Sequence, residues 1–246
     1  MIVDTHIHWP MADERGVDTF LAVLDSYGID RAVVCGYEVL YKKGRVEDWN
    51  DRLSEFCGND AERLVALGTV HLAEGCEKVV KEAERCINTL GMKGFKVHPW
   101  LQGETVFFDS MFELCRVAGE HNVPLMFHDG TPVYAMSSQI GVLAKMFPNT
   151  VFVLGHSGIL HYWEEAIEVG RQFSNVFLTL CGGHPYGLQA ICDQIDIDRI
   201  MWGSDFTGPG ADESIHYRMK LADGLNLASG QRRKIMGENA LRLYWG

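Results

Sequence analysis

The sequence predicts an α/β protein, a single (β/α)8 TIM barrel over residues 1–246. Short apolar, β-branched runs alternate with longer amphipathic stretches along the chain, as expected for repeated strand–helix units and a parallel sheet. Eight such runs occur, and their ends follow one another at intervals of about 30 residues, the length of one strand–helix unit. The chain also lacks the glycine-rich nucleotide fingerprints that open α/β sheets commonly carry, which favours closure into a barrel.

The eight predicted strands are apolar runs that end near polar or glycine residues. In chain order they are Ile2–His8, Arg31–Gly36, Leu64–His71, Gly94–Pro99, Pro124–Gly130, Val151–Gly158, Val176–Gly183 and Ile200–Phe206. A doubly wound open sheet would produce the same local alternation, so it stays the alternative to a closed barrel. No linker, low-complexity tract or internal repeat interrupts the series, which indicates one domain.

Helix signals occupy the segments between these strands. Ser110, with Glu113 three residues on, reads as a capping box and predicts a helix over Met111–His121. Further helices are expected over Tyr162–Gln172 and Gly230–Trp245. The glycines expected to end helices are Gly28, Gly91 and Gly170.

The composition is that of an ordinary globular protein with an excess of acidic residues. Of the 246 residues, 47% are hydrophobic and 22% are charged, and the formal net charge is −11. This charge repels nucleic acid, and no apolar run approaches the length of about 18 residues that a membrane span needs. The seven cysteines form no C-x-x-C pair, which argues against a disulfide framework. We therefore expect a cytoplasmic protein that binds neither nucleic acid nor membranes.

The positions of the histidines carry the strongest functional signal. Seven of the ten lie at the carboxyl ends of predicted strands, namely His6, His8, His71, His98, His128, His156 and His184. In a parallel barrel these ends converge on the face where active sites of this fold are built. Each histidine alone is more easily explained as a satisfied, partly buried side chain, but the seven together predict a site.

Two histidines on the first strand are suited to bind a metal ion. His6 and His8 are two residues apart, so both rings point to the same side of the strand. Imidazole nitrogens bind zinc and similar ions. Asp205 ends the last strand, beside the first in a closed barrel, and its carboxylate could ligate the same metal and accept a proton. The structural alternative for Asp205 is that it caps the following segment. Asp4, two residues before His6, has the same facing but lies deeper and is expected to be a supporting carboxylate.

Six motifs in chain order give the sequence a resemblance to a known enzyme family. They are Asp4-Thr5-His6-Ile7-His8, Gly94-Phe95-Lys96-Val97-His98-Pro99, Pro124-Leu125-Met126-Phe127-His128-Asp129-Gly130, Gly155-His156-Ser157-Gly158, Gly203-Ser204-Asp205-Phe206 and Gly237-Glu238-Asn239-Ala240-Leu241-Arg242-Leu243. Each motif alone is weak. The ordered set resembles the amidohydrolase superfamily, and within it the compact metal-dependent hydrolases and decarboxylases of amidohydrolase family 2.

The resemblance implies roles for five residues. His6, His8 and His128 would be metal ligands, and Asp205 would complete the set. His156 would be the catalytic partner that orients water or polarises the substrate, while Asp205 accepts and donates the proton. The family branch usually holds one divalent metal. Zinc is expected first, although manganese, iron and cobalt accept the same nitrogen and oxygen ligands.

Other side chains near the strand ends are candidates for binding the substrate. Lys96 lies inside an apolar strand, where it would contact an anionic group of the substrate. In relatives with two metals a carbamylated lysine at this place bridges them, and that arrangement stays the alternative. The remaining candidates are His98, Trp100, His184 and Tyr37.

The sequence leaves three functions open. The first is hydrolysis of an amide, lactone or ester of a small molecule by a water that the metal activates. The alternative is metal-dependent, non-oxidative decarboxylation or hydration of an unsaturated or aromatic carboxylic acid, which would use the same residues. The second alternative is a non-catalytic barrel that binds a metal. In each case we expect a small, anionic substrate or ligand and a homodimer.

Overall fold

The computed structural model describes residues 1–9, 16–36, 46–208 and 212–246 and contains eight strands within these ranges. In chain order they are β1 (Val3–Trp9), β2 (Arg31–Gly36), β3 (Leu64–Leu67), β4 (Phe95–Val97), β5 (Leu125–Phe127), β6 (Phe152–Leu154), β7 (Val176–Thr179) and β8 (Ile200–Met201). Every ladder between neighbouring strands is parallel. The alternation of strands and helices predicted from the sequence is confirmed.

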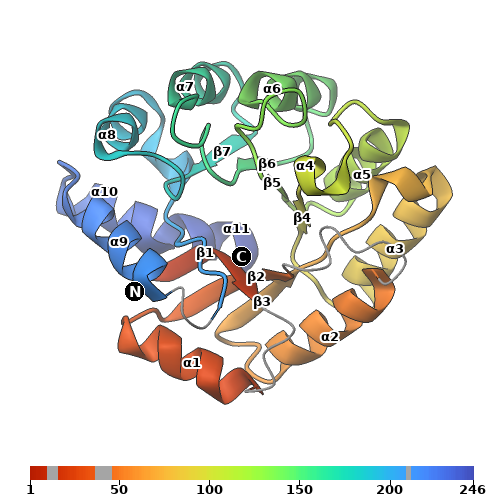
Figure 1. Ribbon diagram of the computed structural model, residues 1–246, viewed down its shortest axis with the longest axis horizontal. Helices are drawn as coiled ribbons and strands as arrows, with labels where there is room; N and C mark the ends of the chain where they lie inside the picture. The colour runs from red at the N-terminus through yellow and green to blue at the C-terminus, as the bar shows by residue number, and fades with distance from the viewer. Residues whose placement is uncertain (10–15, 37–45, 209–211) are drawn as a thin grey trace.

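The strands close into a barrel in which each lies beside its neighbours in the sequence (Figure 1). Ladders join consecutive strands in two sheets, one in the order β1-β2-β3 and the other in the order β4-β5-β6-β7-β8. Two parallel bridges complete the ring: Gly68 pairs with Phe95 between β3 and β4, and Ile7 of β1 pairs with Phe206 just beyond β8. At the second bridge the His8 N–H donates to the Phe206 carbonyl at 2.7 Å. The fold is therefore the (β/α)8 TIM barrel that the sequence predicts.

Helices surround the strands, and α11 lies behind them near the centre of the ring (Figure 1). In chain order they are α1 (Gly16–Ser26), α2 (Val46–Gly58), α3 (Cys76–Asn88), α4 (Pro99–Gln102), α5 (Asp109–Glu120), α6 (Ser137–Met146), α7 (Trp163–Gln172), α8 (Pro185–Gln194), α9 (Asp212–Asp223), α10 (Ser229–Arg233) and α11 (Asn239–Tyr244). The short segments η2 (Leu72–Glu74) and η3 (Ile197–Arg199) are 3-10 helices, and η4 (Lys234–Glu238) is a π-helix. Among the described residues, no helix combines the length and apolar character that a membrane crossing would need.

An apolar layer fills the interior of the barrel beneath the polar site. Its side chains come from the strands and from α11, and they are Val3, Val33, Cys35, Val65, Leu67, Met126, Val153, Met201, Ala240 and Tyr244. Side chains alternate along a strand, so the residue two positions after an inward-facing one also faces inward. His128 follows Met126 by two positions and continues this inward row beyond the end of β5. The apolar layer thus supports the polar residues at the carboxyl end of the barrel.

Three predicted boundaries were wrong. β2 has the predicted bounds and β1 the predicted length, but β3 to β8 are shorter than predicted, and β6 ends at Leu154 because the backbone beyond it turns into a loop. Ser110 does not cap a helix; it lies inside α5, where its hydroxyl donates to the Leu72 carbonyl at 2.6 Å. Gly170 does not end a helix either. It lies within α7, where a Cβ would come within 2.9 Å of the Ile195 side chain.

The other helix predictions hold with small differences. Gly28 and Gly91 follow α1 and α3 with φ of +67° and +65°, the left-handed conformation in which glycine commonly ends a helix. The last helix, predicted over Gly230–Trp245, is a helical run in which α10, η4 and α11 follow one another.

Candidate metal centre

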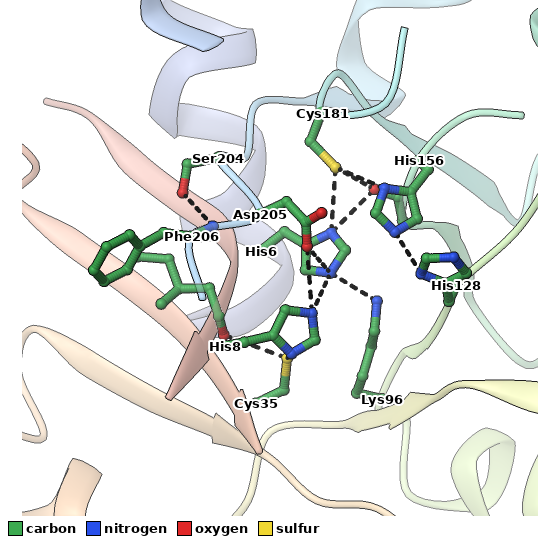
Figure 2. Close-up of polar contacts among 12 residues, drawn as sticks. His6, His8, Cys35, Lys96, His128, His156, Cys181, Ser204, Asp205 and Phe206 are labelled. Atoms are coloured by element: carbon green, nitrogen blue, oxygen red, sulfur yellow. Dashed lines mark hydrogen bonds and ion pairs between the residues drawn. The ribbon is translucent and has the colours of Figure 1, made fainter. Parts of the chain in front are cut away.

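Three of the predicted ligands meet at the carboxyl end of the barrel (Figure 2). The Nε2 atoms of His6 and His8 are 3.2 Å apart. Oδ1 of Asp205 lies 3.5 Å from the first of these nitrogens and 3.3 Å from the second. Both rings are buried, whereas the Asp205 side chain is 32% exposed. The first strand and the segment after the last strand therefore supply one compact group of donor atoms.

The spacing of these atoms fits a divalent metal. With metal–nitrogen distances of about 2.1 Å, tetrahedral coordination places ligand atoms about 3.4 Å apart. The three separations here are 3.2, 3.3 and 3.5 Å. Two imidazole nitrogens and one carboxylate oxygen also suit zinc, manganese, iron and cobalt. The donor set of His6, His8 and Asp205 therefore fits a shared metal ion.

The electrostatics of the cluster keep Asp205 and His6 in the forms that bind metal. Burial alone would raise the pKa of Asp205, but the hydrogen bond from His8 and the charges of His8 and Lys96 outweigh it and lower that pKa below its usual range. Burial lowers the pKa of His6, and the charge of Lys96 lowers it further. An ionised carboxylate and a neutral imidazole need no proton removed before they coordinate a cation. Burial alone would lower the pKa of His8, but its contacts with Cys35 and Asp205 raise that pKa to about 9, so a cation would have to displace a proton from this ring.

Lys96 brings a positive charge to the same cluster. Its side chain is fully buried, and its Nζ lies 2.7 Å from Nε2 of His6. Gly155 provides the space, because a Cβ there would come within 3.3 Å of Nζ and 2.5 Å of the Phe127 carbonyl oxygen. Burial lowers the pKa of Lys96. The amine and a metal ion would compete for the same lone pair of His6, so metal binding requires Nζ to turn away.

His128 joins the cluster through a second imidazole. Its Nδ1 lies 2.7 Å from Nε2 of His156, and the rings of His156 and His6 have centroids 4.9 Å apart. On its other side, His128 stacks on His98 with centroids 3.7 Å apart. Burial is the main cause that lowers the pKa of both His128 and His156, so each ring is neutral and carries one hydrogen. All five predicted ligand and catalytic residues thus gather in one place.

The loop that carries His156 is held by a buried carboxylate that the sequence analysis did not single out. Asp129 accepts the N–H of His156 at 2.7 Å and that of Gly158 at 2.6 Å, and the Ser137 hydroxyl donates to it at 3.2 Å. The three residues after His156 all have positive φ, between 50° and 85°. Non-glycine residues adopt this conformation only at a cost. The Asp129 hydrogen bonds therefore stabilise a strained loop.

Asp4 ties the first strand to the segment after the last. Its Oδ1 accepts the N–H of His6 at 3.1 Å and the N–H of Ser204 at 2.9 Å, and the side chain is fully buried. These bonds hold the His6 and Asp205 segments side by side, the supporting role anticipated for Asp4.

Two buried cysteines, to which the sequence pattern assigned no role, contact the histidine rings. Sγ of Cys35 lies 3.3 Å from Nδ1 of His8. Sγ of Cys181 lies 3.3 Å from Nδ1 of both His6 and His156. Both cysteines lie near the ends of predicted strands, the same signal that singled out the histidines, so that signal could have identified them.

The predicted substrate-binding residues differ in how they lie around the cluster. His98 is buried between the His128 ring and Trp100, whose ring centroid is 5.9 Å away. Trp100 itself is 53% exposed. His184 precedes α8 and is half-buried, with its ring stacked 6.2 Å from Tyr186. Tyr37 lies outside the described residues.

Comparison with known protein families finds a family model that matches nearly the whole chain. Residues 3–245 match the model of the family described as Amidohydrolase. Because the match covers nearly the whole sequence, the chain belongs to the amidohydrolase family, and the resemblance carried by its motifs is confirmed. The members of this family are enzymes, and this protein is one of them.

A relative by sequence comes from Sphingobium sp. strain SYK-6 and is named 2-keto-4-carboxy-3-hexenedioate hydratase. The two are 26% identical over 206 residues, which are 67% of this chain and 60% of the hydratase. The matched region therefore spans less than two thirds of the hydratase.

Solved decarboxylases share the fold. The 2,6-dihydroxybenzoate decarboxylase from Rhizobium superposes with a TM-score of 0.76 at 19% identity, covering 99% of this chain and 98% of that one. A dihydroxybenzoic acid decarboxylase from Polaromonas sp. JS666 was solved with bound manganese and the inhibitor 2-nitroresorcinol. It superposes with a TM-score of 0.76 at 15% identity, covering 99% of this chain and 96% of that one. At these identities the likeness establishes a common barrel fold.

Proposed function

We propose that this protein is a metal-dependent lyase that adds water to the carbon–carbon double bond of a small unsaturated carboxylic acid. The observation that carries the proposal is the cluster of His6, His8 and Asp205 with the Lys96 amine 2.7 Å from one of its nitrogens. The hydratase among its relatives supports this reaction over hydrolysis, which the sequence put first.

The residues that would hold the metal follow from the donor atoms. His6, His8 and Asp205 would bind one divalent cation, with His128 as the further ligand that the family resemblance implies. The manganese in the Polaromonas decarboxylase supports a divalent cation here and makes manganese a candidate beside zinc. When bound, such a cation acts as a Lewis acid toward substrate oxygens.

Lys96 and Asp205 would do the remaining work. The Lys96 amine, when protonated, attracts the carboxylate of the substrate and fixes its orientation. Asp205 accepts the proton that the attacking water gives up as its oxygen bonds to one carbon, and returns that proton to the neighbouring carbon. The sum is addition of H and OH across the double bond, with no group left over. His156, which touches the ring of His128, would orient the reactants.

Decarboxylation is the second candidate because the solved neighbours are decarboxylases. In that reaction the bond to the carboxyl carbon breaks, carbon dioxide leaves, and the electron pair stays on the substrate carbon. Asp205 or His156 then delivers a proton to that carbon. The same side chains would serve both reactions, so the substrate decides between them.

The proposal is tested with the purified protein loaded with manganese or zinc. The probes are 2-keto-4-carboxy-3-hexenedioate, hydroxybenzoates, and a panel of simple esters, lactones and amides. Metal-dependent loss of the conjugated double-bond absorbance without carbon dioxide is the expected result, and His6→Ala should abolish it. His121→Ala, at a histidine after α5, is the matched control and should leave it unchanged.

Release of carbon dioxide from a hydroxybenzoate would instead favour the second candidate. Turnover confined to the esters, lactones or amides would overturn both. Turnover that survives complete removal of metal would overturn the metal requirement.

A further inference from the structure

Cys181 lies behind the two innermost histidine rings, on the side of the rings away from the Nε2 cluster (Figure 2). Its side chain is fully buried just beyond β7. Its Sγ is 3.3 Å from Nδ1 of His6, 3.3 Å from Nδ1 of His156, and 2.7 Å from the carbonyl oxygen of Gly155. One sulfur atom therefore touches both rings and one backbone carbonyl.

The hydrogens available at these atoms restrict their arrangement. A thiol has one hydrogen, and a carbonyl oxygen can only accept. The Cys181 S–H donates to Gly155 at 2.7 Å, its shortest contact, so the sulfur is left to accept from the rings. His156 must then carry its hydrogen on Nδ1.

The position of the hydrogen on His156 determines that on His128. A neutral imidazole has one N–H, and the hydrogen bond at one nitrogen decides which atom carries it. With its hydrogen on Nδ1, His156 has an unprotonated Nε2, and this atom lies 2.7 Å from Nδ1 of His128. His128 must donate there, so its own Nε2 is unprotonated.

His6 obeys the same rule independently. Its Nδ1 lies 3.1 Å from the Gly155 carbonyl oxygen, which can only accept. Its Nε2 faces the Lys96 amine at 2.7 Å, and an ammonium can only donate. Both contacts place the hydrogen of His6 on Nδ1, which agrees with the assignment made from Cys181.

We propose that Cys181 is a positioning residue that sets the histidine tautomers of the site: its sulfur accepts from Nδ1 of His156, His156 accepts from Nδ1 of His128, and His128 keeps an unprotonated Nε2. This is the tautomer in which Nε2 binds a divalent cation. The role toward the metal rests on the proposed function, whereas the tautomers themselves are a property of the metal-free protein. Groups that orient a ligand in this way commonly affect metal affinity by about 10- to 100-fold.

The tautomers are measured on metal-free protein labelled with nitrogen-15 in its histidines, because the ring nitrogens with and without hydrogen differ strongly in chemical shift. His156→Asn and His128→Asn assign the signals. In the unsubstituted protein, both rings should carry hydrogen on Nδ1 only. In Cys181→Ala, which removes the acceptor, both should show a mixture of the two tautomers. Cys181→Ser keeps an acceptor and should restore the single tautomer.

Cys115→Ala is the matched control, since Cys115 is an equally buried thiol on α5. It should leave the ring signals unchanged. Affinity for manganese or zinc should fall about 10-fold or more in Cys181→Ala and stay within about threefold in Cys181→Ser and Cys115→Ala. Hydrogen on Nε2 of His156 in the unsubstituted protein, or unaltered tautomers in Cys181→Ala, would overturn the proposal. Failure of the unsubstituted protein to bind any metal would overturn the proposed function and leave the tautomer assignment standing.

Discussion

Asp205 owes its place in the site to a backbone conformation that few residues other than glycine adopt. Its φ is +57°, in the left-handed region, where asparagine and aspartate are more frequent than other non-glycine residues. Its N–H donates to the His6 carbonyl at 2.8 Å, which fixes the residue against the first strand. The carboxylate can then lie 3.3 Å from the His8 ring, although no regular strand continues that far.

Asp205→Asn separates the two roles of this side chain. The amide oxygen remains a weak metal ligand, but the amide group cannot carry a proton. We expect turnover to fall by at least about 100-fold, while metal affinity falls less than in His6→Ala. Metal per chain after dialysis and the rate on the best probe substrate measure the two effects. Unchanged turnover in Asp205→Asn would show that Asp205 does not carry the proton.

Lys96→Met tests the competition for His6. Removing a buried amine 2.7 Å from a ligand nitrogen removes repulsion toward a cation, and about 1.4 kcal/mol corresponds to tenfold in affinity. We expect metal to bind about tenfold more tightly, while KM for an anionic substrate rises. Lys93→Met, at an exposed lysine just before β4, is the control. Weaker metal binding in Lys96→Met alone would show that the amine supports the site instead of competing for it.

The sequence predicts the site residues whose role follows from lying at a strand end. It does not predict the roles that follow from one particular hydrogen-bond partner. His6, His8 and Asp205 could be predicted because strand ends converge in any parallel barrel. Asp129 and Cys181 also lie near strand ends, so their position could be predicted, but their roles could not. Their contacts depend on loop conformations and on single hydrogen bonds, which periodicity does not encode.

At the scale of elements, the site depends on the loops after the strands more than on the strands themselves. Apolar runs predicted the strands, but from β3 onward the strands end earlier than predicted; β5 and β6 each cover three residues. His128 and His156 lie one and two residues past these ends. Periodicity identifies the apolar run but not the residue at which the backbone leaves the ladder, so the elements were predicted better than their lengths.

The loop after β6 should depend on Asp129 for its conformation. In Asp129→Asn, an NH2 group replaces one of the two carboxylate oxygens and faces a backbone N–H. The N–H groups of His156 and Gly158 can then no longer each have an acceptor. We expect a loss of about 1–3 kcal/mol in the free energy of unfolding, measured by urea denaturation. Ser137→Ala removes only one hydrogen bond to the same carboxylate and should cost about 1 kcal/mol. A larger loss in Ser137→Ala than in Asp129→Asn would contradict this role.

For the whole molecule, the buried thiols make stability depend on alkaline pH. Burial raises the pKa of Cys115 and raises that of Cys192 from 9.0 to about 12. Unfolded thiols lose their protons near pH 9, whereas the folded ones keep them. The unfolded state then binds fewer protons, and stability falls as pH rises above about 9, by up to about 1.4 kcal/mol per pH unit for each thiol.

The measurement is urea unfolding under reducing conditions at several pH values between about 8 and 11. Cys115→Ala should flatten the decline, because it removes one buried thiol from the folded state. Cys76→Ser changes an exposed thiol and should leave the slope as it is. Equal slopes in all three proteins would show that the decline has another source.

The ring of strands closes between β1 and the segment after β8, where Ile7 pairs with Phe206. During synthesis, His6 and His8 leave the ribosome long before Asp205 is added to the chain. Until then β1 and β7 have open edges, which are prone to pair with other chains, and the proposed metal-binding set lacks its carboxylate. In the proposed site, full affinity for a divalent cation is therefore reached only after the barrel has closed. Only chains that have been completed and folded would then bind the ion with full affinity, and incomplete chains would not withdraw metal from the cell.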